Sequence, residues 1–145
     1  MDPHATATNR LLLKTLSAWG AASTVTGAAV WWRAGDDPTR RAFGRQTVAW
    51  GVVDLAIAGV GFWRSRRGSD PTATALRRTL GVNAALDVGY VGGGWWLLRN
   101  ADRVHHRLAR YPASSARGDG AAIIVQGSFL LALDSGFLAM AGRTQ

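Results

Sequence analysis

The stretch VAWGVVDLAIAGVGFW, from Val48 to Trp63, contains one charged residue, Asp54. A helix of a soluble bundle needs a polar face along its length, and this stretch has none. The strict alternation of polar and apolar residues that marks a membrane β-strand is also absent. The stretch therefore predicts a helix that crosses a lipid bilayer, with the arginines that follow it reaching back to the membrane surface.

Three further apolar runs predict that the whole chain is one all-α membrane domain, residues 1–145, built as a bundle of four transmembrane helices. The predicted spans are residues 11–32, 46–63, 79–98 and 121–142. Between the last two, residues 99–117 place Val104, Leu108 and Tyr111 at helical spacing among basic residues, which predicts a helix lying on the membrane surface. We therefore expect a multi-pass protein of the cell membrane. A soluble four-helix bundle is the alternative.

The composition excludes several kinds of site. The chain has no cysteine, which rules out disulfides, thiolate metal sites and cysteine nucleophiles. Its net charge of +8 comes mainly from arginines between the apolar runs, where they would contact lipid headgroups and not nucleic acid. His105 and His106 are adjacent and point to different faces, so neither a metal nor a cofactor is predicted. The basic residues divide evenly between the two sides, so the orientation in the membrane is not predicted.

Glycine and tryptophan are distributed as in membrane helices. Six of the seven tryptophans lie near predicted span ends or, like Trp19, one turn inside, which is the position of an aromatic belt. Trp50 lies deeper. Small residues let membrane helices approach closely. The glycines expected to do so are Gly20, Gly27, Gly51, Gly59, Gly61, Gly89, Gly92, Gly93 and Gly94.

The two halves of the chain resemble each other. Residues 14–33 align with residues 78–97 without a gap, and the second and fourth runs align at a larger offset. The aligned pairs include Trp31 with Trp95, Trp32 with Trp96, Trp19 with Asn83, Ser23 with Asp87, Gln46 with Gln126, and Asp54 with Asp134. The bundle is therefore predicted to consist of two pseudo-symmetric helical hairpins, a 2+2 internal repeat about an axis along the membrane normal.

Each of the last three spans contains one carboxylate: Asp54, Asp87 and Asp134. A charged side chain at the bilayer centre costs about 2.5–3.5 kcal/mol, so these carboxylates need partners or a water-filled cavity. Asn83, Asp87 and Tyr90 follow i, i+4, i+7 spacing and share one helix face. We expect the carboxylates to meet inside the bundle, exchange protons, and be joined by further binding residues. Those residues are Gln46, Trp50, Asn83, Tyr90 and Gln126. A hydrogen-bonded network that only holds the helices together is the alternative.

Three strings that contain these positions resemble motifs of an uncharacterised family of small four-helix bacterial membrane proteins, a domain of unknown function. They are QTVAWGVVD from Gln46 to Asp54, NAALDVGY from Asn83 to Tyr90, and QGSFLLALD from Gln126 to Asp134. The resemblance covers the second to fourth spans. It implies the topology and marks the polar positions, and it implies no activity.

Three functions fit these residues. The favoured one is proton-linked binding or translocation of a small or cationic solute, with Trp50 available for cation–π contact. The second is a membrane-embedded enzyme acting on a lipophilic substrate by epoxide opening, cyclisation or isomerisation, with Asp54, Asp87 and Asp134 as acid and base. The third is a structural or interaction protein. Expected partners are the lipid bilayer and a small solute or lipophilic molecule, and a homodimer is also allowed. Neither the substrate nor the oligomeric state follows from the sequence.

Overall fold

A computed structural model describes residues 3–142, and over that range the chain forms five α-helices and no strand. The helices are α1 (Pro3–Trp32), α2 (Pro38–Arg66), α3 (Ala73–Arg99), α4 (Ala101–Arg107) and α5 (Ala113–Gly142). The prediction of an all-α chain is confirmed. The short helix α4 covers only part of the range 99–117 for which a surface helix was predicted.

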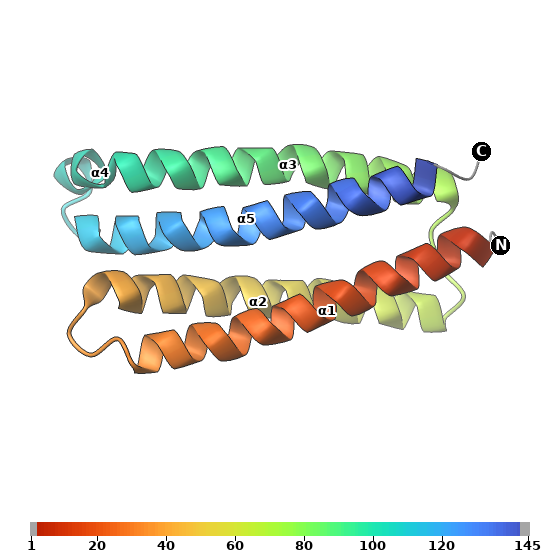
Figure 1. Cartoon of the computed structure of the whole chain (residues 1–145), viewed down its shortest axis with the longest axis horizontal. Helices are drawn as coiled ribbons and strands as arrows, with labels where there is room; N and C mark the ends of the chain where they lie inside the picture. The colour runs from red at the N-terminus through yellow and green to blue at the C-terminus, as the bar shows by residue number, and fades with distance from the viewer. Residues whose placement is uncertain (1–2, 143–145) are drawn as a thin grey trace.

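The four long helices form two antiparallel hairpins (Figure 1). Helix α1 packs along α2, and α3 packs along α5. Helix α5 also contacts α2 and α1, so it provides most of the contact between the hairpins. Helices α2 and α3 are consecutive, yet no Cα atoms of the two approach within 8 Å. Both termini lie at the end of the bundle that holds the α2–α3 connection, and α4 and the α1–α2 connection lie at the opposite end.

Local capping explains where the helices begin. The carboxylate of Asp37 accepts hydrogen bonds from the backbone N–H groups of Thr39 and Arg40, and Pro38 occupies the first turn of α2. The hydroxyl of Thr72 accepts from the backbone of Ala75 at the start of α3. These caps lie outside the apolar runs, so the helices are longer than the predicted spans.

Glycines set the distance between helices in each hairpin. A Cβ on Gly51 would lie 2.6 Å from the carbonyl oxygen of Gly20, and a Cβ on Gly27 would lie 2.9 Å from that of Gly44. In the second hairpin, a Cβ on Gly94 would lie 2.9 Å from the carbonyl oxygen of Gly120. Gly61 faces the side chain of Leu13. Four of the glycines expected to pack closely face open space instead, namely Gly59, Gly89, Gly92 and Gly93.

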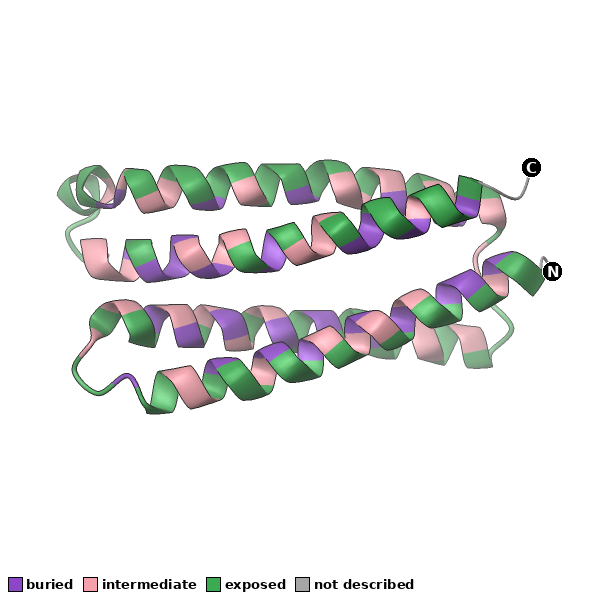
Figure 2. Ribbon diagram, in the orientation of Figure 1, coloured by how far each residue is buried: buried purple, intermediate pink, exposed green. Residues whose placement is uncertain are grey.

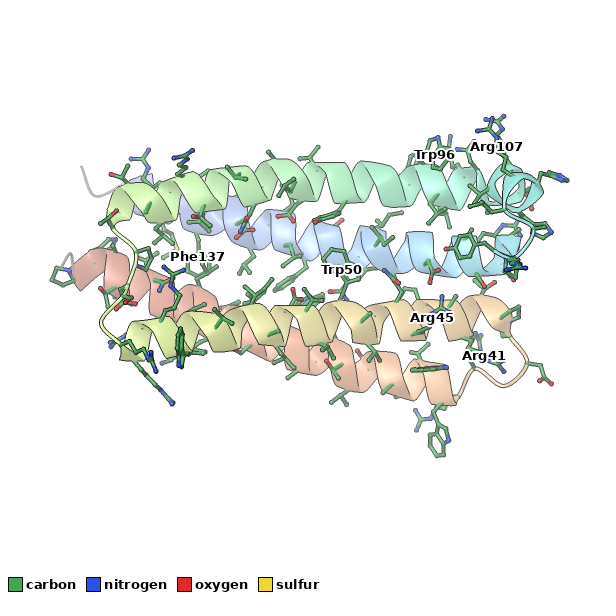
Figure 3. The ribbon with its side chains drawn as sticks, turned by 180° about the vertical axis from the view of Figure 1, so that it is seen from behind. Arg41, Arg45, Trp50, Trp96, Arg107 and Phe137 are labelled. Carbon is green, nitrogen blue, oxygen red and sulfur yellow. The ribbon has the colours of Figure 1, made fainter. Side chains whose placement is uncertain are left out.

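A hydrophobic core joins all four long helices in the half of the bundle nearer the α2–α3 connection. Its buried members are Leu16, Ala58, Leu76, Leu80, Leu133 and Phe137. Phe137 points from α5 toward the space between the hairpins (Figure 3).

The outer surface carries many apolar side chains. Buried residues follow the facing sides of the helices, and the outward sides are exposed (Figure 2). Several apolar side chains are at least half exposed, namely Val52, Ile57 and Val60 on α2 and Val82, Leu86 and Val88 on α3. Within the described part of the chain, two helices, α2 and α5, are long and apolar enough to cross a membrane. Only 22% of the apolar window of α2 and 28% of that of α5 is buried, whereas the core helix of a soluble protein is mostly buried.

Candidate functional site

Helix α2 places Trp50 and Asp54 one turn apart on one face. Asp54 is only 1% exposed, because α1 approaches α2 closely at this point. A Cβ on Gly20 of α1 would lie 2.9 Å from the carbonyl oxygen of Gly51 and 3.1 Å from the Cβ of Asp54, so a larger residue would push α1 away from α2. The close contact of α1 and α2 therefore buries the first carboxylate.

Helices α3 and α5 supply the other two carboxylates. Asp87 is 3% exposed and Asp134 is 6% exposed. The two carboxyl groups lie close enough for their charges to interact, and Asn83 lines the same cavity. Asp54 lies close enough to both for their charges to interact. The structure thus brings the three predicted carboxylates together from three helices.

These residues surround one cavity of about 600 Å³ between the two hairpins. Trp50 points from α2 into this space (Figure 3). Asn83, Asp87 and Tyr90 line it from α3, as predicted from their shared helix face. Leucines of α1, α3 and α5 form an apolar section next to the carboxylates. At the opposite end the cavity is lined by Asn9, Arg64 and Asp70, near the α2–α3 connection, where the amide of Asn9 donates a hydrogen bond to Asp70 at 3.3 Å.

Several polar atoms at the carboxylate end lack a partner. Within residues 3–142, nothing forms a hydrogen bond with Asp54 Oδ2, Asp87 Oδ2 or the indole nitrogen of Trp50, although all three atoms are buried. A buried polar group without a partner costs about 1–3 kcal/mol, and more when it is charged. Most such atoms in proteins are satisfied, so these three need a partner that the protein itself does not supply, such as water or a ligand. The two free carboxylate oxygens fit a ligand that donates hydrogen bonds or carries positive charge.

An aromatic contact lies beside the carboxylates in the cavity lining. The rings of Trp50 and Tyr90 meet edge to face, with centroids 5.0 Å apart and an angle of 78° between their planes. The pair joins α2 to α3, whose backbones remain apart. Tyr90 is 41% exposed, so this side of the pair reaches the outer surface.

The two predicted glutamines lie outside this cavity lining. Gln126 is 1% exposed, and its side-chain oxygen accepts a hydrogen bond of 2.7 Å from the indole N–H of Trp19. Its amide donates to the hydroxyl of Ser23 at 3.2 Å. Gln126 therefore links α5 to α1, across the two hairpins. Gln46 is partly buried in α2.

Trp19 was expected near an aromatic belt, and it packs inside the bundle instead. Its ring stacks on Phe129 of α5, with centroids 3.8 Å apart and 6° between the planes. The internal alignment carried a signal for this, because it pairs Trp19 with Asn83 and Ser23 with Asp87, which both face the interior.

A second buried polar cluster forms around the carboxylate of Asp119 and was not predicted from the sequence. Asp119 is 6% exposed and accepts hydrogen bonds from the guanidinium of Arg45, at 3.2 and 3.3 Å, and from the hydroxyl of Tyr111 at 2.5 Å. Burial and the contact with Asp119 raise the pKa of Tyr111. This cluster joins α2, α5 and the loop before α5 at the end of the bundle opposite the α2–α3 connection. Asp119 lies outside the apolar runs, where no hydropathy signal marks it.

The residues between Pro3 and Gly142 include no group of three or more His, Asp or other ligating side chains that could hold a metal ion. His105 and His106 are exposed on α4.

Comparison with known proteins bears on identity and not on activity. The model of a family of unknown function, DUF6992, matches residues 15–135. This confirms the expected resemblance to a family without a known activity. The match extends over the first helix as well as the three strings that carried the resemblance. No curated protein and no solved structure is significantly similar to the chain.

Proposed function

The chain belongs to DUF6992, a family of unknown function, and we propose from its site that it binds and translocates a small or cationic solute across a membrane in exchange for protons. The observation that supports this most is the meeting of Asp54, Asp87 and Asp134 around one cavity, with two carboxylate oxygens unpartnered. Ionisable groups inside membrane helices are rare, and they commonly mark ion pathways and proton relays.

The proposal includes a bundle of four spanning helices, and the tryptophans support it. The backbone of Trp31 lies against Gly44 of α2, so these two residues are at the same level of the bundle. From Gly44 to Trp63, α2 rises by about 28 Å at about 1.5 Å per residue, close to the roughly 30 Å of a bilayer's hydrocarbon core. Exposed tryptophans thus lie near both expected surfaces, and Asp54 lies about midway between them.

We also propose that the two hairpins are an internal repeat. Gly27 of α1 packs against Thr47 of α2, where a Cβ on Gly27 would lie 3.0 Å from that of Thr47. The sequence alignment pairs these two positions with Val91 and Gly127. Those residues also pack together, because a Cβ on Gly127 would lie 3.2 Å from a methyl carbon of Val91. The alignment that pairs residues of the two halves therefore also pairs their helix contacts. Such a repeat would bring polar residues of both halves to the centre of the bundle.

Exchange follows from the charges at the site. The carboxyl groups of Asp87 and Asp134 can share a proton while the cavity is empty of solute. A cation that enters between them and Asp54 favours the ionised form of all three carboxylates, so a proton leaves. Protonation from the other side reverses this and releases the cation. Binding and proton release are then linked, and a gradient of either can drive the other.

Proton movement in liposomes tests the proposal. Protein reconstituted with an internal pH-sensitive dye should move protons when organic ammonium ions are added outside. Asp54→Asn, Asp87→Asn and Asp134→Asn should reduce this signal to that of protein-free liposomes. Asp36→Asn is the matched control, because Asp36 is exposed in the α1–α2 connection. Helical circular dichroism should be equal for all variants. A proton signal that survives all three site substitutions would contradict the proposal.

The paired carboxyl groups of Asp87 and Asp134 also suit a second function, acid–base catalysis on a lipophilic substrate. A protonated carboxyl group next to an ionised one supplies an acid and a base at the same site. An enzyme of this kind would convert epoxides or alkenes supplied in the bilayer, and mass spectrometry would detect the products. Loss of product in Asp87→Asn, with no proton movement in wild-type liposomes, would favour the enzyme over the carrier.

A further inference from the structure

The cavity is closed on one side and open on another. Helices α1 and α5 close its back, while α2 and α3 flank it with their backbones apart and meet through the rings of Trp50 and Tyr90. Val53, Ile57 and Val60 of α2 and Leu86 of α3 line the cavity and are nevertheless 48%, 54%, 58% and 54% exposed. Side chains that line a cavity and are also half exposed mark its opening. The opening therefore faces sideways between α2 and α3, along the apolar flank of the bundle.

The cavity has two chemically different sections. At the back of one section lie the three carboxylates, each at most 6% exposed. The other section extends along α2 toward Arg64, about 15 Å from Asp54 at the helical rise of about 1.5 Å per residue. Aliphatic side chains line most of its length, including Leu13, Leu16, Val60, Leu76 and Leu80, and the polar residues Asn9, Arg64 and Asp70 line its far end.

A small hydrated cation would fill only the first section. The whole cavity, about 600 Å³, is in the range of sites for drug-sized ligands. Water is a poor occupant of the aliphatic part of the second section, because the side chains there offer few hydrogen bonds. A ligand complementary to both sections needs a positive charge at one end and an apolar body. Trp50 and Tyr90 present aromatic rings beside the carboxylates and favour a charge that is an organic cation.

We propose that the solute is a lipophilic organic cation, whose charged group lies between Asp54, Asp87 and Asp134 and whose apolar body lies in the lateral opening between α2 and α3. This inference rests on the proposed function and names its substrate class. The apolar body would contact Ile57, Val60 and Leu80 on one side and lipid on the other.

Two ammonium ions with the same headgroup test this inference. Tetramethylammonium carries the charge alone, and dodecyltrimethylammonium adds a long apolar chain. Protein in lipid nanodiscs should release protons on titration with either ion, and empty nanodiscs titrated in parallel correct for partition into lipid. After that correction, the long-chain ion should act at a concentration at least about tenfold lower. Dodecanol, which has the chain without the charge, should release no protons.

A substitution within the opening separates the chain from the headgroup. Ile57→Trp should fill part of the apolar section and weaken the effect of dodecyltrimethylammonium about tenfold, without changing that of tetramethylammonium. Val52→Trp is the matched control, because Val52 is 52% exposed on the same helix and lies outside the cavity lining.

The outcomes distinguish the two proposals. Equal potency of the two ammonium ions, or an unchanged long-chain titration in Ile57→Trp, would overturn the lipophilic substrate and leave proton-linked binding intact. A protein that releases no protons with either ion would overturn the proposed function itself. If Ile57→Trp changed the oligomeric state and no titration, the opening would be a contact surface for a second copy, and this inference would be wrong.

Discussion

Substitution of Gly118 by alanine should push the two hairpins apart. Gly118 lies near the start of α5 and faces the backbone of α2. A Cβ at this position would overlap the carbonyl oxygen of Thr39 and lie 2.9 Å from both the Cβ of Ala42 and the backbone nitrogen of Phe43. Two of these atoms belong to the backbone of a helix and cannot rotate away. Helices α2 and α5 must therefore separate at their contact.

The expected loss of stability can be worked from this contact. Overpacking costs about 1–3 kcal/mol, and a rigid backbone on the opposite side favours the upper value. Alanine regains about 0.8–1 kcal/mol over glycine within a helix. The net loss should be about 2 kcal/mol. Gly136 lies in the same helix and faces open space, so Gly136→Ala should keep only the gain. The two variants should differ by about 3 kcal/mol.

Equilibrium unfolding in mixed micelles, with a denaturing detergent and helical circular dichroism as the signal, measures this difference. Gly118→Ala should unfold at a lower fraction of the denaturing detergent than the wild type, and Gly136→Ala at an equal or higher fraction. Equal midpoints for the two variants would refute the tight contact between α2 and α5.

Three further predictions test other parts of the molecule. Gln126→Leu leaves the indole N–H of Trp19 without its acceptor and should cost about 1–3 kcal/mol in the same assay. The double variant Gln126→Leu/Trp19→Phe should be little less stable than Gln126→Leu alone. If the losses of the two single variants simply added, this hydrogen bond would be contradicted. Burial and the hydrogen bond to a carboxylate of α5 raise the pKa of Tyr111, so the folded state holds the phenol proton more tightly and loses stability as the pH rises above about 10. Tyr111→Phe should flatten this alkaline loss in unfolding curves measured against pH, and an unchanged slope would show that another group is responsible. Because the chain has no cysteine, the double variant Asp36→Cys/Ser69→Cys places one thiol at each end of the bundle. An impermeant maleimide should add one label per chain in intact vesicles and two after permeabilisation, and two labels in intact vesicles would exclude a spanning bundle.

The number and type of long helices were predictable because they depend on a coarse property, the absence of a charged face. The ends of the helices were not. Helix α2 begins at Pro38 and α5 at Ala113, well before the predicted spans at residues 46 and 121. Hydropathy marks the part of a helix that avoids water, whereas the carboxylate of Asp37 decides where α2 begins. A pattern of apolar residues therefore underestimates helix length wherever the ends are polar.

The carboxylate site was predictable for a similar physical reason. A carboxylate in an apolar helix is costly, so Asp54, Asp87 and Asp134 were expected to face inward and meet. Partners of the other polar residues were harder to predict, because a helix face does not say which helix lies opposite. Gln126 was expected beside the substrate, and the packing of α5 on α1 places it against Trp19 instead.

The separation of the α2 and α3 backbones bears on selectivity. The hairpins are connected mainly through α5, and a small rotation about that helix would widen or narrow the lateral opening while rearranging the Trp50–Tyr90 contact between α2 and α3. Molecules of different girth could then be accommodated at similar energetic cost. A binding site with such an adjustable wall discriminates poorly by shape, so discrimination would depend on charge and on the length of the apolar body. Broad rather than narrow specificity is the expected behaviour.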